Sequence, residues 1–196
     1  MSGTDPTPPP PGPDGPDPLR TPPPAAVPVV LAFGANLGDR AATLDAAVAE
    51  LGAVDGIRIR AVSAFVQTAA VGGPPQPDYL NAVALAETTL APLDLLDVCH
   101  QVEARHGRSR TVRWGPRTLD VDIILYGDLR SDRSDLELPH PRVSRRAFVL
   151  TPWLEVDPAA VMPGPDGPQP VADLLLAAPD RSTVRPWLGP GPETTG

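Results

Sequence analysis

The stretch Thr118–Tyr126, with the sequence TLDVDIILY, begins as an alternation of apolar and acidic side chains. Leu119, Val121, Ile123 and Leu125 are two residues apart, the period at which the side chains of a β-strand return to one face. We therefore predict a strand at 118–126 with these four residues on its core face. The two acidic side chains must then lie together on the other face.

Asp120 and Asp122 are about 7 Å apart on that second face, because each strand residue advances the chain by about 3.3 Å. Two carboxylates at this spacing repel each other unless a cation lies between them. Mg²⁺ suits the position, since it is typically bound by one or two carboxylates together with water and phosphate oxygens. Asp120 and Asp122 are the candidate metal ligands. The alternative is that both point into solvent at a sheet edge.

Turn residues and apolar periodicity divide the rest of the chain into short strands and helices. Strands are predicted at 29–33, 57–68, 79–90 and near 182–186 in addition to 118–126, and helices at 44–51, 92–107, 145–156 and near 171–177. The order strand, helix, strand, strand, helix, strand favours an α+β fold. We expect a ferredoxin-like antiparallel sheet with helices packed on it in three αβα layers.

Five arginines precede the acidic strand: Arg105, Arg108, Arg110, Arg113 and Arg117. No acidic residue interrupts them, which is unusual in a chain of net charge -8. Guanidinium groups bind phosphate oxygens in a bidentate manner, so a bound complex of metal and polyphosphate beside the aspartates would explain the cluster. The alternative is that the arginines only neutralise the two aspartates.

The composition excludes several classes of enzyme. All 16 basic residues are arginine, and the absence of lysine excludes a Walker-A loop, a protein-kinase site and a Schiff-base mechanism. The single cysteine, Cys99, excludes an intrachain disulfide and a multi-cysteine zinc site. The chain has no apolar run of about 18 residues, and its acidic balance argues against general nucleic-acid binding. We expect a cytoplasmic protein that binds neither nucleic acid nor membrane.

The proline content divides the chain into one domain and two tails. Twelve of the 29 prolines fall within residues 1–28, which contain few apolar side chains. Such a segment buries too little apolar surface to offset the entropy lost on ordering. We predict a disordered proline-rich tail at 1–28, one domain at 29–186 and a second disordered tail at 187–196. A proline motif that docks a partner domain is the alternative for the first tail.

Tyr79 and Asn81 share one face of their predicted strand. An asparagine amide both donates and accepts hydrogen bonds, which suits the edge of a pyrimidinone ring. Phe148 or Phe33 offers an aromatic face for stacking, and the loop at 68–73 offers backbone groups. We hypothesise a site for a flat polar heterocycle. The alternative is that these residues belong to the core or to turns.

Four stretches together resemble the 6-hydroxymethyl-7,8-dihydropterin pyrophosphokinase family of folate biosynthesis. The longest is RWGPRTLDVDI at 113–123, and FGANLG at 33–38, PDYLN at 77–81 and LPHPR at 138–142 support it. The resemblance implies an enzyme that transfers pyrophosphate from ATP to the hydroxymethyl oxygen of the pterin and releases AMP, and we expect it to be monomeric or weakly associated. It also implies two Mg²⁺ ions bound by the two aspartates.

The resemblance further implies roles for individual residues. The catalytic residues it implies are Arg108, Arg117, Asp120 and Asp122. The implied ATP site comprises Gln101, Glu103, Arg108, Arg113, Trp114, Arg117, Ile123, His140 and Arg146. The implied pterin site comprises Thr68, Ala69, Val71, Tyr79, Asn81 and Phe148.

Two other classes of protein stay open at this level. One is a non-catalytic relative that binds pterin or nucleotide, and the loss of a carboxylate would favour it, although both are present. The other is an interaction module that docks partners through the arginine-rich loop and the proline-rich tail. Release of AMP that depends on the pterin distinguishes the enzyme from both.

Overall fold

Strand β1 (Val27–Ala35) is an interior strand of the sheet and is buried on both faces along most of its length. It pairs antiparallel with β4 (Tyr79–Thr88) on one side and with β5 (Asp120–Tyr126) on the other. Beyond β4 the sheet continues with β2 (Ile57–Val62), β3 (Val66–Thr68) and β10 (Arg185–Pro186). The computed structural model describes residues 17–70, 75–107, 118–164 and 167–189.

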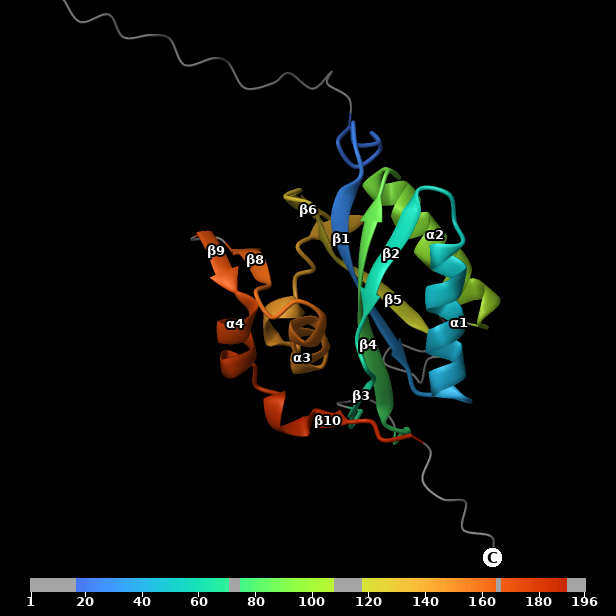
Figure 1. Cartoon of the computed structure of the whole chain (residues 1–196), viewed down its shortest axis with the longest axis vertical. Coiled ribbons are helices and arrows are strands. Elements are labelled where there is room, and N and C mark those ends of the chain that lie inside the picture. Colours follow the sequence, from blue (N-terminus) through green and yellow to red (C-terminus); the bar gives the residue numbers. More distant parts are fainter. Residues whose placement is uncertain (1–16, 71–74, 108–117, 165–166, 190–196) are drawn as a thin grey trace, which may run out of the picture.

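Helices cover both faces of this sheet (Figure 1). α1 (Arg40–Gly52) and α2 (Pro92–Arg105) pack on one face. α3 (Ala147–Val156) and α4 (Val171–Ala177) pack on the other. Each face holds its own cluster of buried apolar side chains. The predicted α+β fold, an antiparallel sheet in three αβα layers, is therefore confirmed.

Local signals start two of these helices, and a distant residue caps a third. The Asp39 carboxylate accepts a hydrogen bond from the Ala42 N–H in the first turn of α1. Pro92 is the first residue of α2, where its missing N–H leaves no hydrogen bond unmade. The N-cap of α3, Arg146, makes no side-chain cap hydrogen bond. Instead, the Ala147 N–H donates to Asp180, far along the chain.

The alternation predicted for 118–126 breaks near the end of β5. The pairing of β5 with β1 slips by one residue between Val30 and Leu31, as a β-bulge requires. Ile124 and Leu125 therefore both pack with α3, while Tyr126 returns to the face of α1 and α2. The prediction that Leu125 shares the core face of Val121 is wrong for this reason. The aspartates precede the slip and keep their common face.

Several shorter elements also differ from the prediction. The single strand predicted at 57–68 is two strands, β2 and β3, which both pair with β4. Two hairpins were not predicted, because their strands are too short to show a period: β6 (Ser131–Arg133) with β7 (Leu136–Leu138), and β8 (Val161–Gly164) with β9 (Gly167–Pro170). Two 3-10 turns complete the fold, η1 (Val143–Arg145) and η2 (Arg181–Thr183).

The segment 17–28 packs on the domain, so the prediction of a disordered tail is wrong for this part of it. Leu19 is 1% exposed and belongs to the apolar cluster beneath α1 and α2. At the start of α2, the Leu93 N–H donates to the Leu19 carbonyl over 2.9 Å. The buried leucine and this backbone hydrogen bond therefore anchor a segment whose average composition is that of a tail. Residues 1–16 lie outside the described residues.

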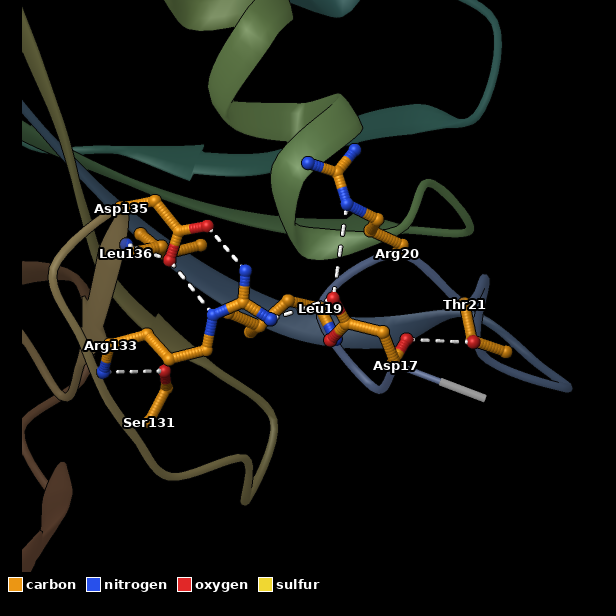
Figure 2. A network of polar contacts seen from close by, with 8 residues as sticks. All are labelled: Asp17, Leu19, Arg20, Thr21, Ser131, Arg133, Asp135 and Leu136. Atoms are coloured by element: carbon orange, nitrogen blue, oxygen red, sulfur yellow. Dashed lines mark hydrogen bonds and ion pairs between the residues drawn. The ribbon is translucent and has the colours of Figure 1, made fainter. Parts of the chain in front are cut away.

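Charged side chains tie the same segment to the β6–β7 hairpin (Figure 2). Arg133 donates to Asp17 through Nη1 over 2.6 Å and to Asp135 through Nε over 3.0 Å. The hydrogen bond from Arg133 lowers the pKa of Asp17. All three side chains are at least partly exposed, so solvent screens the network and the buried Leu19 contributes most of the anchoring.

The C-terminal boundary also differs from the prediction. Trp187 was assigned to a disordered tail, yet its N–H donates to the Phe65 carbonyl over 3.1 Å. Its ring packs edge to face on that of Phe65, with centroids 5.5 Å apart. Residues 190–196 lie outside the described residues. Within the described ranges, no helix combines the length and the apolar character that a membrane crossing requires.

Candidate active site

The candidate site lies on the α3 face of the sheet, where three strands place their side chains in two rows. Gly34 of β1 is paired with Asn81 of β4 on one side and with Asp120 of β5 on the other. Ala32 is paired in the same way with Asp122 on its β5 side. Since paired residues of neighbouring strands point to the same face, the amide and both carboxylates project together.

Gly34 gives this arrangement its floor. A Cβ atom at this position would lie 3.2 Å from Oδ1 of Asn81, which is tighter than an ordinary contact. A side chain at position 34 would therefore press on the Asn81 amide. The sequence contained this signal in FGANLG, although the prediction gave Gly34 no role in the site.

A first cavity, with a volume of about 370 Å³, opens above this floor. Its lining includes Thr68, Ala69, Tyr79, Asn81, Asp120, Asp122, Arg146 and Phe148. Asn81 and Thr68 are 5% and 6% exposed, and the Asn81 amide donates to the Thr68 hydroxyl over 3.0 Å. This bond fixes the amide with its oxygen toward Gly34. The structure thus brings the predicted heterocycle residues into one cavity with the two aspartates.

Arg146 and His140 approach one carboxylate from outside the strand. Nη1 of Arg146 donates to Oδ2 of Asp122 over 3.1 Å, and the same guanidinium lies over the Phe148 ring, 5.6 Å from its centroid. Nε2 of His140 is 3.7 Å from the same Asp122 oxygen. Asp122 therefore lies close to Arg146 and His140, two of the residues predicted for the ATP site.

Burial lowers the pKa of His140, and this outweighs the opposing effect of Asp122. The ring is therefore neutral near pH 7. Its Nδ1 accepts from the Arg142 N–H over 3.1 Å, which leaves the ring proton on Nε2, the nitrogen nearer Asp122. The backbone N–H of His140 donates to the carbonyl of Ile124 and holds this loop against β5.

A second cavity, of about 260 Å³, lies beside the first. Its lining includes His100, Glu103, Asp120, Asp122, Ile123, Asp135 and His140. Glu103 is 2% exposed and accepts a hydrogen bond from the Val121 N–H over 2.8 Å, which ties α2 to β5. Asp120 and Asp122 line both cavities and so mark the place where the two meet.

Gln101 does not belong to this cavity. It is exposed and is absent from the lining, whereas His100, which was not among the predicted site residues, lines it. Residues two apart on a helix point about 200° apart, while residues three apart share a face. Helix periodicity therefore places His100, and not Gln101, on the same face of α2 as Glu103.

Five of the predicted site residues lie outside the described residues: Val71, Arg108, Arg113, Trp114 and Arg117. The structure adds lining residues to the first cavity that the prediction did not contain: Gln76, Arg142, Asp180 and Thr183. They come from loops and turns without a periodic pattern. Only the folded structure identifies these four as residues that line the cavity.

The two aspartates fit a magnesium ion that takes its other ligands from a bound phosphate and water. Among the described residues, no three His, Cys, Asp or Glu side chains form a group that could hold a metal ion by themselves. Asp120 and Asp122 supply hard oxygen donors on one face of β5, and Mg²⁺ completes such a shell with phosphate and water. Two carboxylates on one face are therefore a donor set that fits a Mg²⁺ ion whose remaining ligands are phosphate and water.

Residues 30–158 match the family model of 7,8-dihydro-6-hydroxymethylpterin-pyrophosphokinase (HPPK). The 2-amino-4-hydroxy-6-hydroxymethyldihydropteridine pyrophosphokinase of Pseudomonas aeruginosa is 40% identical over 151 residues, which cover 77% of this chain and 91% of that protein. The protein of the same name from Methylorubrum extorquens is 44% identical over 134 residues, or 68% of this chain and 85% of that one.

Solved structures agree on the fold. An HPPK-DHPS in complex with substrates superposes with a TM-score of 0.59 at 11% identity, over 80% of this chain and 43% of that one. Wild-type HPPK-DHPS of Plasmodium falciparum, solved with pterin and p-hydroxybenzoate, gives 0.58 at 11% identity, over 83% and 46%. The chain spans less than half of these longer chains.

Fold and sequence together define the class of protein as a pyrophosphokinase, an ATP-dependent diphosphotransferase. More narrowly, the chain belongs to the HPPK family.

Proposed function

We propose that this chain transfers the pyrophosphoryl group of ATP to 6-hydroxymethyl-7,8-dihydropterin in folate biosynthesis and releases AMP. The observation that carries the proposal is the meeting of two cavities at Asp120 and Asp122. A reaction between two bound substrates requires two adjacent sites with the transferred group between them. The charge on that group requires cations at the same place.

The first cavity is the proposed pterin site. The buried pair of Asn81 and Thr68 offers an amide and a hydroxyl to the polar edge of the ring. Tyr79 and Phe148 line the same cavity and offer aromatic faces. Ala69 contributes to the lining from the loop after β3. Together these groups suit a flat bicyclic ring with one hydrogen-bonding edge.

The second cavity is the proposed nucleotide site. Ile123 provides an apolar surface, and Glu103, His100 and His140 provide polar groups. The neutral His140 donates through Nε2, as the fixed Nδ1 acceptor requires. Arg146 stands at the aspartates with its guanidinium already oriented by Asp122 and Phe148. It supplies positive charge where the transferred phosphates would lie.

Asp120 and Asp122 are the residues that would hold Mg²⁺. The ion, when bound, neutralises phosphate charge and orients the transferred group. The residues of the chain supply position: Asn81 and Thr68 orient the pterin, Glu103 fixes α2 to β5, and Arg146 aligns the phosphates. Charge stabilisation and alignment are the main protein contributions to phosphoryl transfer. Arg108 and Arg117 belong to the same proposal as phosphate contacts.

We further propose a cytoplasmic monomer whose partners are ATP and the pterin alone. The test is a coupled assay for AMP release, with and without the pterin and with and without Mg²⁺. We expect release only when ATP, pterin and Mg²⁺ are all present. Asp122→Ala should lower it by about 10²-fold or more, whereas Asp128→Ala, an exposed aspartate just beyond β5, should behave as wild type.

A non-catalytic binding protein is the rival reading of the same cavities. Titration of a non-hydrolysable ATP analogue with Mg²⁺, followed by the pterin, separates the two. Binding of both ligands without AMP release would identify the non-catalytic protein. Failure of both to bind would reject the assignment of the two cavities.

A further inference from the structure

We infer that Asp180 is a positioning residue for the pterin side of the site, and that it acts through the first turn of α3. This inference rests on the proposed function of the first cavity. Asp180 lies beyond residues 30–158, the range that matches the family model. It nevertheless lines the first cavity, as does Thr183 from the same turn.

The key contact is a helix cap supplied from a distant part of the chain. Oδ1 of Asp180 accepts from the Ala147 N–H, the first residue of α3, over 2.8 Å. The first N–H groups of a helix have no partner within the helix, and Arg146, the N-cap residue, makes no side-chain cap bond. Asp180 therefore does what a local Ser, Thr or Asp does at most helix starts. Its negative charge also faces the positive end of the helix.

Ala147 lies between two residues of the site. Arg146 precedes it and holds Asp122 over 3.1 Å, while Phe148 follows it and lines the first cavity beneath the same guanidinium. The peptide group whose N–H binds Asp180 is the link between Arg146 and Ala147. Loss of the acceptor would free this peptide group to rotate. The side chains of Arg146 and Phe148 would then lose their fixed orientation.

The turn that carries Asp180 is itself well fixed. The Thr183 N–H and hydroxyl both donate to the Asp180 carbonyl, over 2.9 Å and 2.7 Å. The Arg181 N–H donates to the carbonyl of Ala178, which is buried in the cluster on the α3 face. The carboxylate thus has a rigid base, which a positioning role requires.

The test compares Asp180→Ala with Asp180→Asn. The alanine removes the acceptor, whereas asparagine keeps an oxygen at nearly the same position. By the usual scale for loss of a helix cap, we expect Asp180→Ala to raise the Kd of the pterin by about fivefold or more. Asp180→Asn should stay within about threefold of wild type. Asp173→Ala, an exposed aspartate in the first turn of α4, is the matched control and should leave the Kd unchanged.

The Kd is measured by titration, because its value does not change when part of the protein sample is inactive. An unchanged Kd in Asp180→Ala, or equal weakening in Asp180→Asn, would overturn the inference. If the alanine variant does not fold, Asp180→Glu replaces it, since the extra methylene displaces the acceptor, and the same weakening is expected. A wild-type chain that binds no pterin would reject the proposed function instead, so the two failures are distinguishable.

Discussion

Arg146 reaches from the start of α3 to β5 and donates to the Asp122 carboxylate over 3.1 Å. The two residues belong to different layers of the fold, since α3 covers the face of the sheet on which the aspartate lies. The contact gives the carboxylate pair a cationic neighbour within the described residues. Because Arg146 immediately precedes α3, any shift of this helix would also move the cation that contacts Asp122.

Asp122→Ala should reduce turnover by about 10²-fold or more, because it removes a candidate metal ligand and a partner of Arg146. The change relieves repulsion with Asp120 but leaves Arg146 without this ion pair. Both side chains of the pair are partly exposed, so each effect is about 1 kcal/mol or less. The melting temperature should therefore shift by no more than about 4 °C. Near-normal AMP release with Mg²⁺ would contradict the metal-site assignment.

Asn81→Ala should weaken pterin binding and leave nucleotide binding nearly unchanged. The substitution leaves the buried Thr68 hydroxyl without its donor and removes the amide from the first cavity. A buried polar group without a partner costs about 1–3 kcal/mol, which corresponds to about 5- to 150-fold in Kd. Separate titrations of pterin and of Mg²⁺ with an ATP analogue measure this. Tyr79→Phe serves as the control, and equal loss of both ligands would show that Asn81 is only structural.

Gly34→Ala should mimic the Asn81 change without touching the amide itself. The added methyl would lie 3.2 Å from the Asn81 oxygen and force that side chain to move. We expect weaker pterin binding and a cost in stability of about 1–3 kcal/mol, as for other overpacked sites. Gly107→Ala is not a suitable control because its φ is positive, so Ala35→Gly, in the same strand, is used instead. Unchanged pterin affinity in Gly34→Ala would show that the cavity floor tolerates a side chain.

Removal of residues 2–16 should leave the melting temperature unchanged, whereas removal of residues 2–24 should lower it. The longer deletion removes Leu19, which is 1% exposed, together with the partner of Arg133. Leu19→Ala alone should destabilise the fold by about 2–5 kcal/mol, the usual range for a buried leucine. Thermal and denaturant unfolding of the full chain and of these three variants measure the differences. Equal stability of the two truncated chains would mean that the segment contributes nothing.

Cys99 should resist thiol reagents in the folded protein. Burial raises the pKa of this thiol to about 12, so the reactive thiolate is scarce at pH 8. The side chain is also fully buried on α2. Labelling by a thiol-specific reagent should therefore be slow until denaturant unfolds the chain and then become rapid. Rapid labelling of the native protein would show that α2 opens locally.

The amino-acid sequence by itself determined which side chains of the candidate site share a face. The alternation in 118–126 placed Asp120 and Asp122 together, and the spacing of Tyr79 and Asn81 placed them on one face of β4. Both predictions agree with the structure, because the period of a strand follows from its local backbone geometry. The same rule, applied to α2, pairs Glu103 with His100 and not with Gln101.

Only the tertiary structure decided which of these faces meet. The pairing of β1 with β4 and β5 brings Asn81 and Asp120 to opposite sides of Gly34, and its one-residue slip turns Leu125 away from the predicted face. The burial of Leu19 and the cap from Asp180 likewise join segments far apart in the chain. Strand register, bulges and long-range contacts depend on the free energy of the whole packed core, which no local period encodes.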